Sequence, residues 1–183
     1  MKRVDMFVRI CIEKGYVSQE RAEWLQYALE KRIVTLLCFV PLLTLGLLMV
    51  NQATVAGFFM AFCLLRTQTN GFHAKSVGGC LIFSMIGEVL FLKILPLVWN
   101  NTIRCVFLGV SCLLIWLLAP YNHPSMDLSS EEIIACAKSA KLRLCALMLA
   151  LGTSYWLQQH YFTLGITLGI IMAASTLTIP YCL

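Results

Sequence analysis

Charged residues are scarce in this chain, and their scarcity excludes most soluble folds. Only 13% of its 183 residues are Asp, Glu, Lys or Arg, whereas 60% are hydrophobic. A water-soluble domain of this length would expose far too much apolar surface with those proportions. A polytopic membrane protein fits, because lipid covers the apolar side chains.

The spacings that build metal sites and disulfide frameworks are also missing. The nine cysteines are odd in number, form no Cys-x-x-Cys pair and lie mostly inside apolar runs, where cysteine behaves as a small hydrophobic residue. No His-Glu-x-x-His motif occurs, and neither a second histidine nor a carboxylate stands at ligand spacing. We therefore expect no metal, no cofactor and no disulfide framework.

The sequence also lacks the features of a cleavable signal peptide and of a nucleic-acid-binding protein. No apolar segment directly follows Met1-Lys2-Arg3, so we expect no cleavable signal peptide and entry into the membrane through internal spans. The formal net charge of +5 does not indicate nucleic-acid binding, because the cations cluster at the edges of apolar runs. Membrane anchors and topology signals have that distribution.

Six apolar runs predict an all-α, polytopic integral membrane protein with six transmembrane helices, because a backbone in lipid satisfies its polar groups by forming helices. The runs cover residues 33–50, 53–65, 77–99, 103–119, 142–158 and 161–180. The second run has only 13 residues, against the roughly 17–25 that a span needs. It crosses only by drawing in Asn51-Gln52 and Arg66, or by thinning the bilayer.

Residues 1–32 form the one extended charged region and predict a pair of amphipathic helices at the membrane interface. One apolar stripe contains Val4, Phe7, Val8, Cys11 and Ile12. A second helix begins after Ser18. A small solvated hairpin is the alternative interpretation. We thus expect cytoplasmic amphipathic helices over 1–32 and a transmembrane domain over 33–183.

The distribution of lysine and arginine predicts the orientation. With the N-terminus inside, twelve of the fourteen cations lie on inner segments, Arg104 lies outside and Lys93 lies within the third span. Both termini are then cytoplasmic, provided that the second run crosses. On the inner loop 120–141, Ser129 or Ser130 followed by Glu131 and Glu132 predicts the start of a helix that continues into the fifth span.

A polar, glycine-containing insert joins the second and third runs, and it contains His73 and Cys80. On a continuous helix these residues would lie about 10.5 Å apart along the axis, too far for proton transfer. We expect Gly78-Gly79 to let the chain fold back, so that His73 activates a Cys80 thiol at the start of the third span. The helix dipole and the cations Lys75 and Arg66 would favour thiolate. An incidental His–Cys pair is the alternative.

Three further polar residues are candidates for the same site. Arg66 is predicted to orient the site or to bind a substrate carboxylate, or else to be a topology anchor. Gln68 is a candidate donor to an oxyanion. Glu88, inside the third span, either lines the site or makes a structural contact with another helix.

The insert resembles the signature of the accessory gene regulator protein B (AgrB) family of bacterial membrane cysteine peptidases. The matching residues are Arg66, Gly71, His73-Ala74 and Cys80, and an Ala-Pro pair, Ala119-Pro120, follows the fourth run. Many members carry Gly-Gly where this chain has Asn70-Gly71. The length, the basic N-terminus and the six apolar runs are also similar.

The resemblance implies a reaction. His73 would activate Cys80, which cuts a propeptide of the AgrD type and retains its core as an acyl thioester. An internal cysteine or serine of the peptide then closes a thiolactone or lactone ring. The resemblance also implies quorum sensing as the process, the cell membrane as the location and a homodimer as the assembly, although no residue pattern fixes the number of copies. The acidic tail of such propeptides suits the cationic inner face.

Two other functional classes use the same spans. A non-catalytic peptide exporter or channel would not need a thiol at position 80. A sensor or scaffold would use residues 1–32 for contacts and would tolerate loss of both His73 and Cys80.

Overall fold

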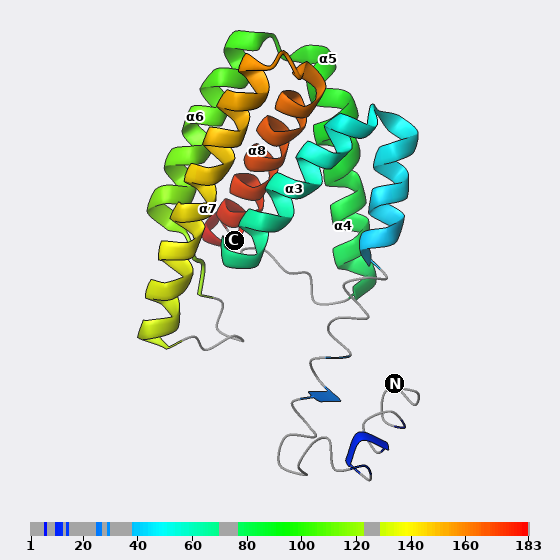
Figure 1. Ribbon diagram of the computed structural model, residues 1–183, viewed down its shortest axis with the longest axis vertical. Helices are drawn as coiled ribbons and strands as arrows, with labels where there is room; N and C mark the ends of the chain where they lie inside the picture. The colour runs from blue at the N-terminus through cyan, green and yellow to red at the C-terminus, as the bar shows by residue number, and fades with distance from the viewer. Residues whose placement is uncertain are drawn as a thin grey trace. The chain divides into compact units, whose positions relative to one another are not determined.

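In the computed structural model of the protein, every described secondary-structure element is helical (Figure 1). The chain divides into two compact units, Met1–Leu42 and Leu43–Leu183. The structure describes Met6, residues 10–12, Lys14, Leu25, Gln26, Leu29, and residues 38–69, 77–122 and 129–182, apart from the side chains of Val77 and Cys182.

Little of the first unit is described. Met6, residues 10–12, Leu25-Gln26 and Leu29 are helical, and the Lys14 N–H donates to the Ile10 carbonyl at 3.0 Å. Most of residues 1–32 lie outside the described residues. The interfacial helices and the division into 1–32 and 33–183 therefore stay predictions.

A helix coincides with each of the six apolar runs. In chain order the helices are Cys38–Met49, α3 (Gln52–Thr69), the continuous stretch of α4 (Val77–Val89), the π-helix η1 (Leu90–Ile94) and α5 (Leu95–Val98), then α6 (Asn101–Leu118), α7 (Ser130–Trp156) and α8 (His160–Cys182). Pro96 follows η1 and has no N–H to donate, which accounts for the local widening of the helix.

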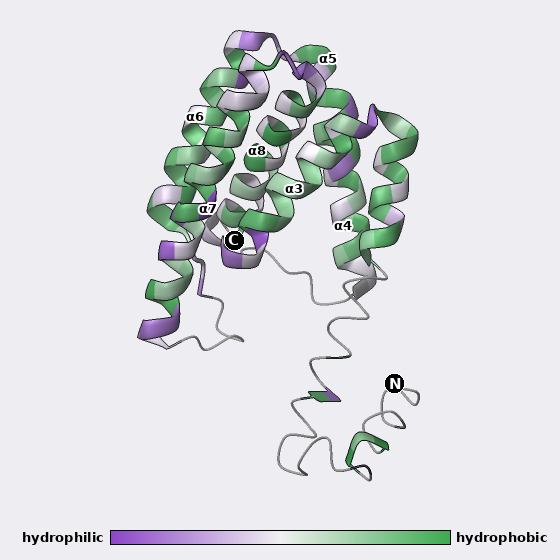
Figure 2. Ribbon diagram, viewed as in Figure 1, coloured by the Kyte–Doolittle hydropathy of each residue, from purple (hydrophilic) through white to green (hydrophobic). Residues whose placement is uncertain are grey.

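Three of the described helices are long and apolar enough to cross a membrane: Gly78–Val98, Asn101–Leu118 and His160–Tyr181. Figure 2 shows hydrophobic residues along most of the length of these helices and hydrophilic residues toward the ends. The protein is therefore a membrane protein with multiple candidate spans. Six crossings, and the cytoplasmic placement of both termini, remain predictions.

Polar residues between the runs begin three of the helices. The Asn51 side chain accepts the Ala53 N–H at 2.8 Å, and the Asn100 side chain accepts the Ile103 N–H at 2.9 Å. Ser129 and Glu132 form a capping box at the start of α7, and the backbone and side-chain hydrogen bonds with Ser129 lower the pKa of the exposed Glu132 carboxyl. The predicted helix start after Ser129 is confirmed, and the helix runs unbroken to Trp156.

Helices α3 and α8 cross with their backbones in contact because small residues line the crossing. A methyl group added to Gly57 would lie 2.6 Å from the Phe162 carbonyl oxygen, and one added to Gly169 would lie 2.5 Å from the Phe58 carbonyl oxygen. Such small residues allow membrane helices to approach closely without a hydrophobic driving force between them. The crossing fixes α3 against the buried centre of α8.

The main core lies where α3, α6, α7 and α8 meet. Its buried side chains include Leu65 of α3, Ile115 of α6, Leu144 of α7 and Ile170 of α8. Helix α3 is thus held on one side by α8 and on another by α7. The C-terminal turn of α3 carries the first residues of the candidate site.

Candidate functional site

Polar side chains gather in the last turn of α3, the helix end that precedes the connector to α4. Arg66, Thr67, Gln68 and Thr69 follow the apolar stretch of this helix. Arg66 is partly buried, and its Nη1 is shielded from solvent. Its guanidinium lies within electrostatic range of Cys80.

Cys80 lies in the first turn of α4, as the fourth residue of a helix that begins at Val77. The side chain is partly exposed and its thiol is free. The prediction that Cys80 opens the third apolar helix is confirmed. A thiol at a helix N-terminus faces the positive end of the helix dipole, and Arg66 adds a cation within electrostatic range of Cys80.

The prediction that Gly78-Gly79 bends the chain is wrong. Both glycines are helical and belong to α4, because the apolar residues that follow extend the helix back to Val77. A reversal that brings His73 to Cys80 therefore has to occur before Val77.

His73 and Gly71 lie in the connector 70–76, outside the described residues. The meeting of imidazole and thiol stays a prediction. What the structure brings together is Arg66 from one side of the connector and Cys80 from the other. Gln68, partly buried, lies in the same helix turn as Arg66.

Glu88 lies deeper along α4 than the thiol. It follows Cys80 by eight residues, about 12 Å along the helix axis. Its side chain is only 1% exposed and packs against the helix Cys38–Met49, where a methyl group added to Gly46 would lie 2.6 Å from Oε1. Glu88 thus contacts a neighbouring helix.

Arg143 of α7 contacts the site-bearing turn, and this contact is new relative to the sequence analysis. Its Nη1 donates to the Leu64 carbonyl at 2.9 Å and to Thr67 Oγ1 at 2.6 Å. The sequence analysis counted Arg143 only among the cations that set orientation. Its position inside the run 142–158 was the available signal, because a cation within an apolar run usually has a partner.

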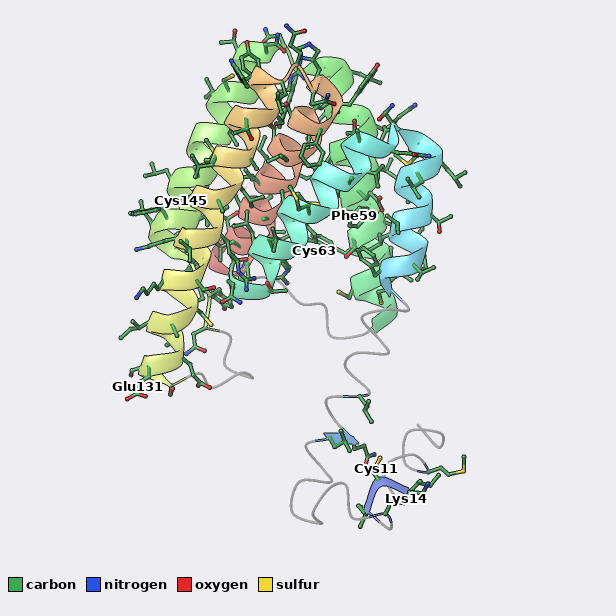
Figure 3. The ribbon with its side chains drawn as sticks, viewed as in Figure 1. Cys11, Lys14, Phe59, Cys63, Glu131 and Cys145 are labelled. Carbon is green, nitrogen blue, oxygen red and sulfur yellow. The ribbon has the colours of Figure 1, made fainter. Side chains whose placement is uncertain are left out.

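The other described cysteines do not form a second site. Figure 3 shows Cys63 on α3 and Cys145 on α7, two separate helices. Cys63, Cys105, Cys112, Cys136 and Cys145 are free thiols. Within the described residues no group of three or more His, Cys, Asp or Glu side chains is arranged to hold a metal ion. Cys80 is distinguished by its helix terminus and by Arg66.

The family model for Accessory gene regulator B matches residues 5–178 of the chain, and this range includes Arg66, His73 and Cys80. No curated protein and no solved structure matches the chain. Because the match covers nearly the whole chain, the protein belongs to the accessory gene regulator B (AgrB) family, whose members take part in processing the peptides of agr quorum sensing.

Proposed function

We propose that the protein is a membrane-embedded cysteine endopeptidase that removes the C-terminal tail of an autoinducing-peptide precursor and promotes closure of the remaining peptide into a thiolactone or lactone. The observation that carries the proposal is the placement of Cys80 in the first turn of α4, in electrostatic range of the partly buried Arg66, in a chain of this family.

The first half-reaction is acyl transfer to the enzyme. His73 takes the proton of the Cys80 thiol, and the thiolate attacks the scissile carbonyl of the propeptide. The peptide C–N bond breaks as the C–S bond forms. His73 then returns its proton to the leaving amine, and the acidic tail departs with a free N-terminus. The core of the peptide stays bound to Cys80 as a thioester.

The second half-reaction closes the ring. An internal cysteine or serine of the peptide attacks the thioester carbonyl, and the Cys80 thiolate leaves. Exchange of one thioester for a thiolactone conserves bond energy that hydrolysis would release. Ring closure therefore needs exclusion of water, for which a site at the mouth of an apolar helix is suited.

Arg66 and Gln68 have proposed supporting roles. Arg66 stabilises the Cys80 thiolate or orients a carboxylate of the substrate, because its guanidinium lies within electrostatic range of Cys80. Gln68, in the same turn, is a candidate donor to the oxyanion. For Gly71, which lies outside the described residues, the proposed role is to give the chain before His73 the freedom to turn.

The substrate is proposed to be a propeptide of the AgrD type with an amphipathic leader, a short core and an acidic tail. The leader would lie in the same interface as the charged segment 1–32. The acidic tail complements the cations of the inner face. We place the active site on the cytoplasmic side of the cell membrane.

The test is co-expression with a cognate propeptide. Replacement of Cys80 by Ala or of His73 by Ala should abolish cleavage, and Cys145→Ser, an exposed thiol on α7, is the matched control that should retain it. In the wild type a propeptide fragment should be trapped on Cys80 by a bond that hydroxylamine cuts.

Unchanged cleavage by the Cys80→Ala variant would reject the peptidase. Product that appears outside cells while this variant leaves the propeptide uncut would instead indicate a transporter that carries unprocessed peptide.

A further inference from the structure

The last turn of α3 is attached to the rest of the protein by contacts from two other segments. Arg143 of α7 donates from one side to the Leu64 carbonyl and to the Thr67 hydroxyl. From another side the Tyr121 N–H, just after α6, donates to the Thr69 carbonyl at 3.0 Å. We call these two contacts the α3 clamp.

The α3 clamp acts on the turn that carries Arg66. Thr67 Oγ1 also donates to the Leu64 carbonyl at 3.1 Å, so Arg143, Thr67 and Leu64 form a closed set of three contacts. Arg66 lies between Leu64 and Thr67 in the chain and cannot rotate about the helix axis without breaking that set. The clamp therefore fixes the position of the helix turn from which the Arg66 side chain extends.

Arg143 is attached to a rigid support. It precedes the buried Leu144, and Ala140 and Leu147 lie in the same core. The capping box at Ser129 fixes the start of the same helix. Functional groups are held most precisely by residues on rigid, packed helices, and α7 meets that condition.

The nearby cation Lys141 shows that the contact of Arg143 is specific. Lys141 Nζ lies over the ring of Trp116, 5.0 Å from the centroid, and so contacts α6. A cation that served only to set membrane orientation would need no defined partner. Arg143 instead makes two hydrogen bonds to one helix turn.

We infer that Arg143 is a positioning residue: through its hydrogen bonds to Leu64 and Thr67 it holds in place the last turn of α3, which carries Arg66. The inference rests on the proposed function for its consequence in catalysis. The geometry itself is tested without any substrate, by the reactivity of the Cys80 thiol.

The experiment measures alkylation by iodoacetamide in the full-length protein in lipid nanodiscs, resolved by residue with mass spectrometry. The rate at Cys80 is divided by the rate at Cys105, an exposed thiol on α6. For Arg143→Ala we expect this ratio to fall by about threefold to tenfold at pH 7.5, because Arg66 is no longer held near the thiolate. Arg143→Lys should recover part of the loss.

The matched control is Lys141→Ala. Lys141 is a neighbouring cation on the same helix as Arg143, and its Nζ lies over the Trp116 ring of α6. This variant should leave the ratio unchanged. A ratio for Arg143→Ala equal to that of the wild type would overturn the inference.

Two further results keep the inference testable. Thr67→Val removes the hydroxyl while leaving the cation, and it should lower the ratio in the same direction by a smaller factor. If Arg143→Ala does not fold, an unchanged ratio in both Thr67→Val and Arg143→Lys overturns the inference.

Propeptide cleavage supplies the second readout. Arg143→Ala should lower kcat for propeptide cleavage with little change in KM. A rise in KM alone, with a normal rate of Cys80 alkylation, would mean that Arg143 binds substrate and would overturn the positioning role. Loss of the proposed function itself would appear as cleavage by Cys80→Ala, a result that leaves the alkylation ratio to decide the role of Arg143.

Discussion

At the scale of single residues, Arg66 places a positive charge within electrostatic range of Cys80. It lies just beyond the apolar run 53–65, and its Nη1 is shielded from solvent. A guanidinium stays charged in proteins, so this partly desolvated cation is available to stabilise an anion in the site.

Gly78 gives a prediction about the start of α4. The glycine is helical, and a methyl group added to it would meet no described atom within 4 Å. We expect Gly78→Ala to fold normally, to stabilise the helix by up to about 1 kcal/mol and to keep cleavage within about twofold of the wild type. Thermal unfolding in detergent and the propeptide assay are the measurements.

The control for Gly78 is Gly109→Ala on α6, which also has open space around it and is distant in sequence from the site. A fall of more than about tenfold in the rate of propeptide cleavage in Gly78→Ala, but not in Gly109→Ala, would contradict this prediction. It would mean that Gly78 acts as a hinge, or that the substrate backbone passes close to it.

At the scale of helices, the α3–α8 crossing gives a prediction about stability. A methyl group on Gly169 would meet the Phe58 carbonyl oxygen at 2.5 Å and Ala61 Cβ at 2.9 Å. Backbone atoms cannot move aside as a flexible side chain does. Gly169→Ala should therefore force the helices apart and lower the free energy of unfolding by about 1–3 kcal/mol.

The matched variant for this crossing is Gly152→Ala on α7, where a methyl group meets nothing within 4 Å. Comparing denaturation midpoints in the same detergent isolates the effect of the contact from that of the glycine itself. Equal midpoints for the two variants would contradict a backbone-to-backbone crossing.

The sequence was sufficient to predict the helices, because their causes are local. Apolar runs predicted where the helices lie, and Ser129 followed by Glu132 predicted the beginning of α7. The prediction of a bend at Gly78-Gly79 was wrong. A glycine pair often ends a helix, but here the apolar residues that follow extend the helix through both glycines.

Contacts between distant helices were beyond a single sequence. Arg143 and Thr67 are separated by 76 positions, and no local pattern connects them. The same applies to Gly46 against Glu88, and to the glycines of the α3–α8 crossing, which look like ordinary residues of apolar runs. The residues of the candidate site were predicted from the sequence, whereas the contact of Arg143 with the last turn of α3 emerged only from the packing.

At the scale of the whole molecule, the second helix decides which side of the membrane carries Cys80. Helix α3 has 18 residues, from Gln52 to Thr69, and is longer than the 13-residue apolar run because it includes flanking polar residues at both ends. Its length is about 27 Å, close to the roughly 30 Å of the hydrocarbon core. Local thinning or snorkelling of Arg66 would cover the difference.

This length predicts that α3 crosses and that Cys80 faces the cytoplasm. A membrane-impermeant maleimide applied outside intact cells should then leave Cys80 unlabelled, and should label it once the membrane is permeabilised. The external control is Asn101→Cys, at the first residue of α6 on the expected outer side. Labelling of Cys80 from outside, with Asn101→Cys protected, would mean that α3 does not cross the membrane. The acidic tail of a cytoplasmic propeptide would then have no access to the Cys80 thiol. Export of the propeptide would have to come before its cleavage.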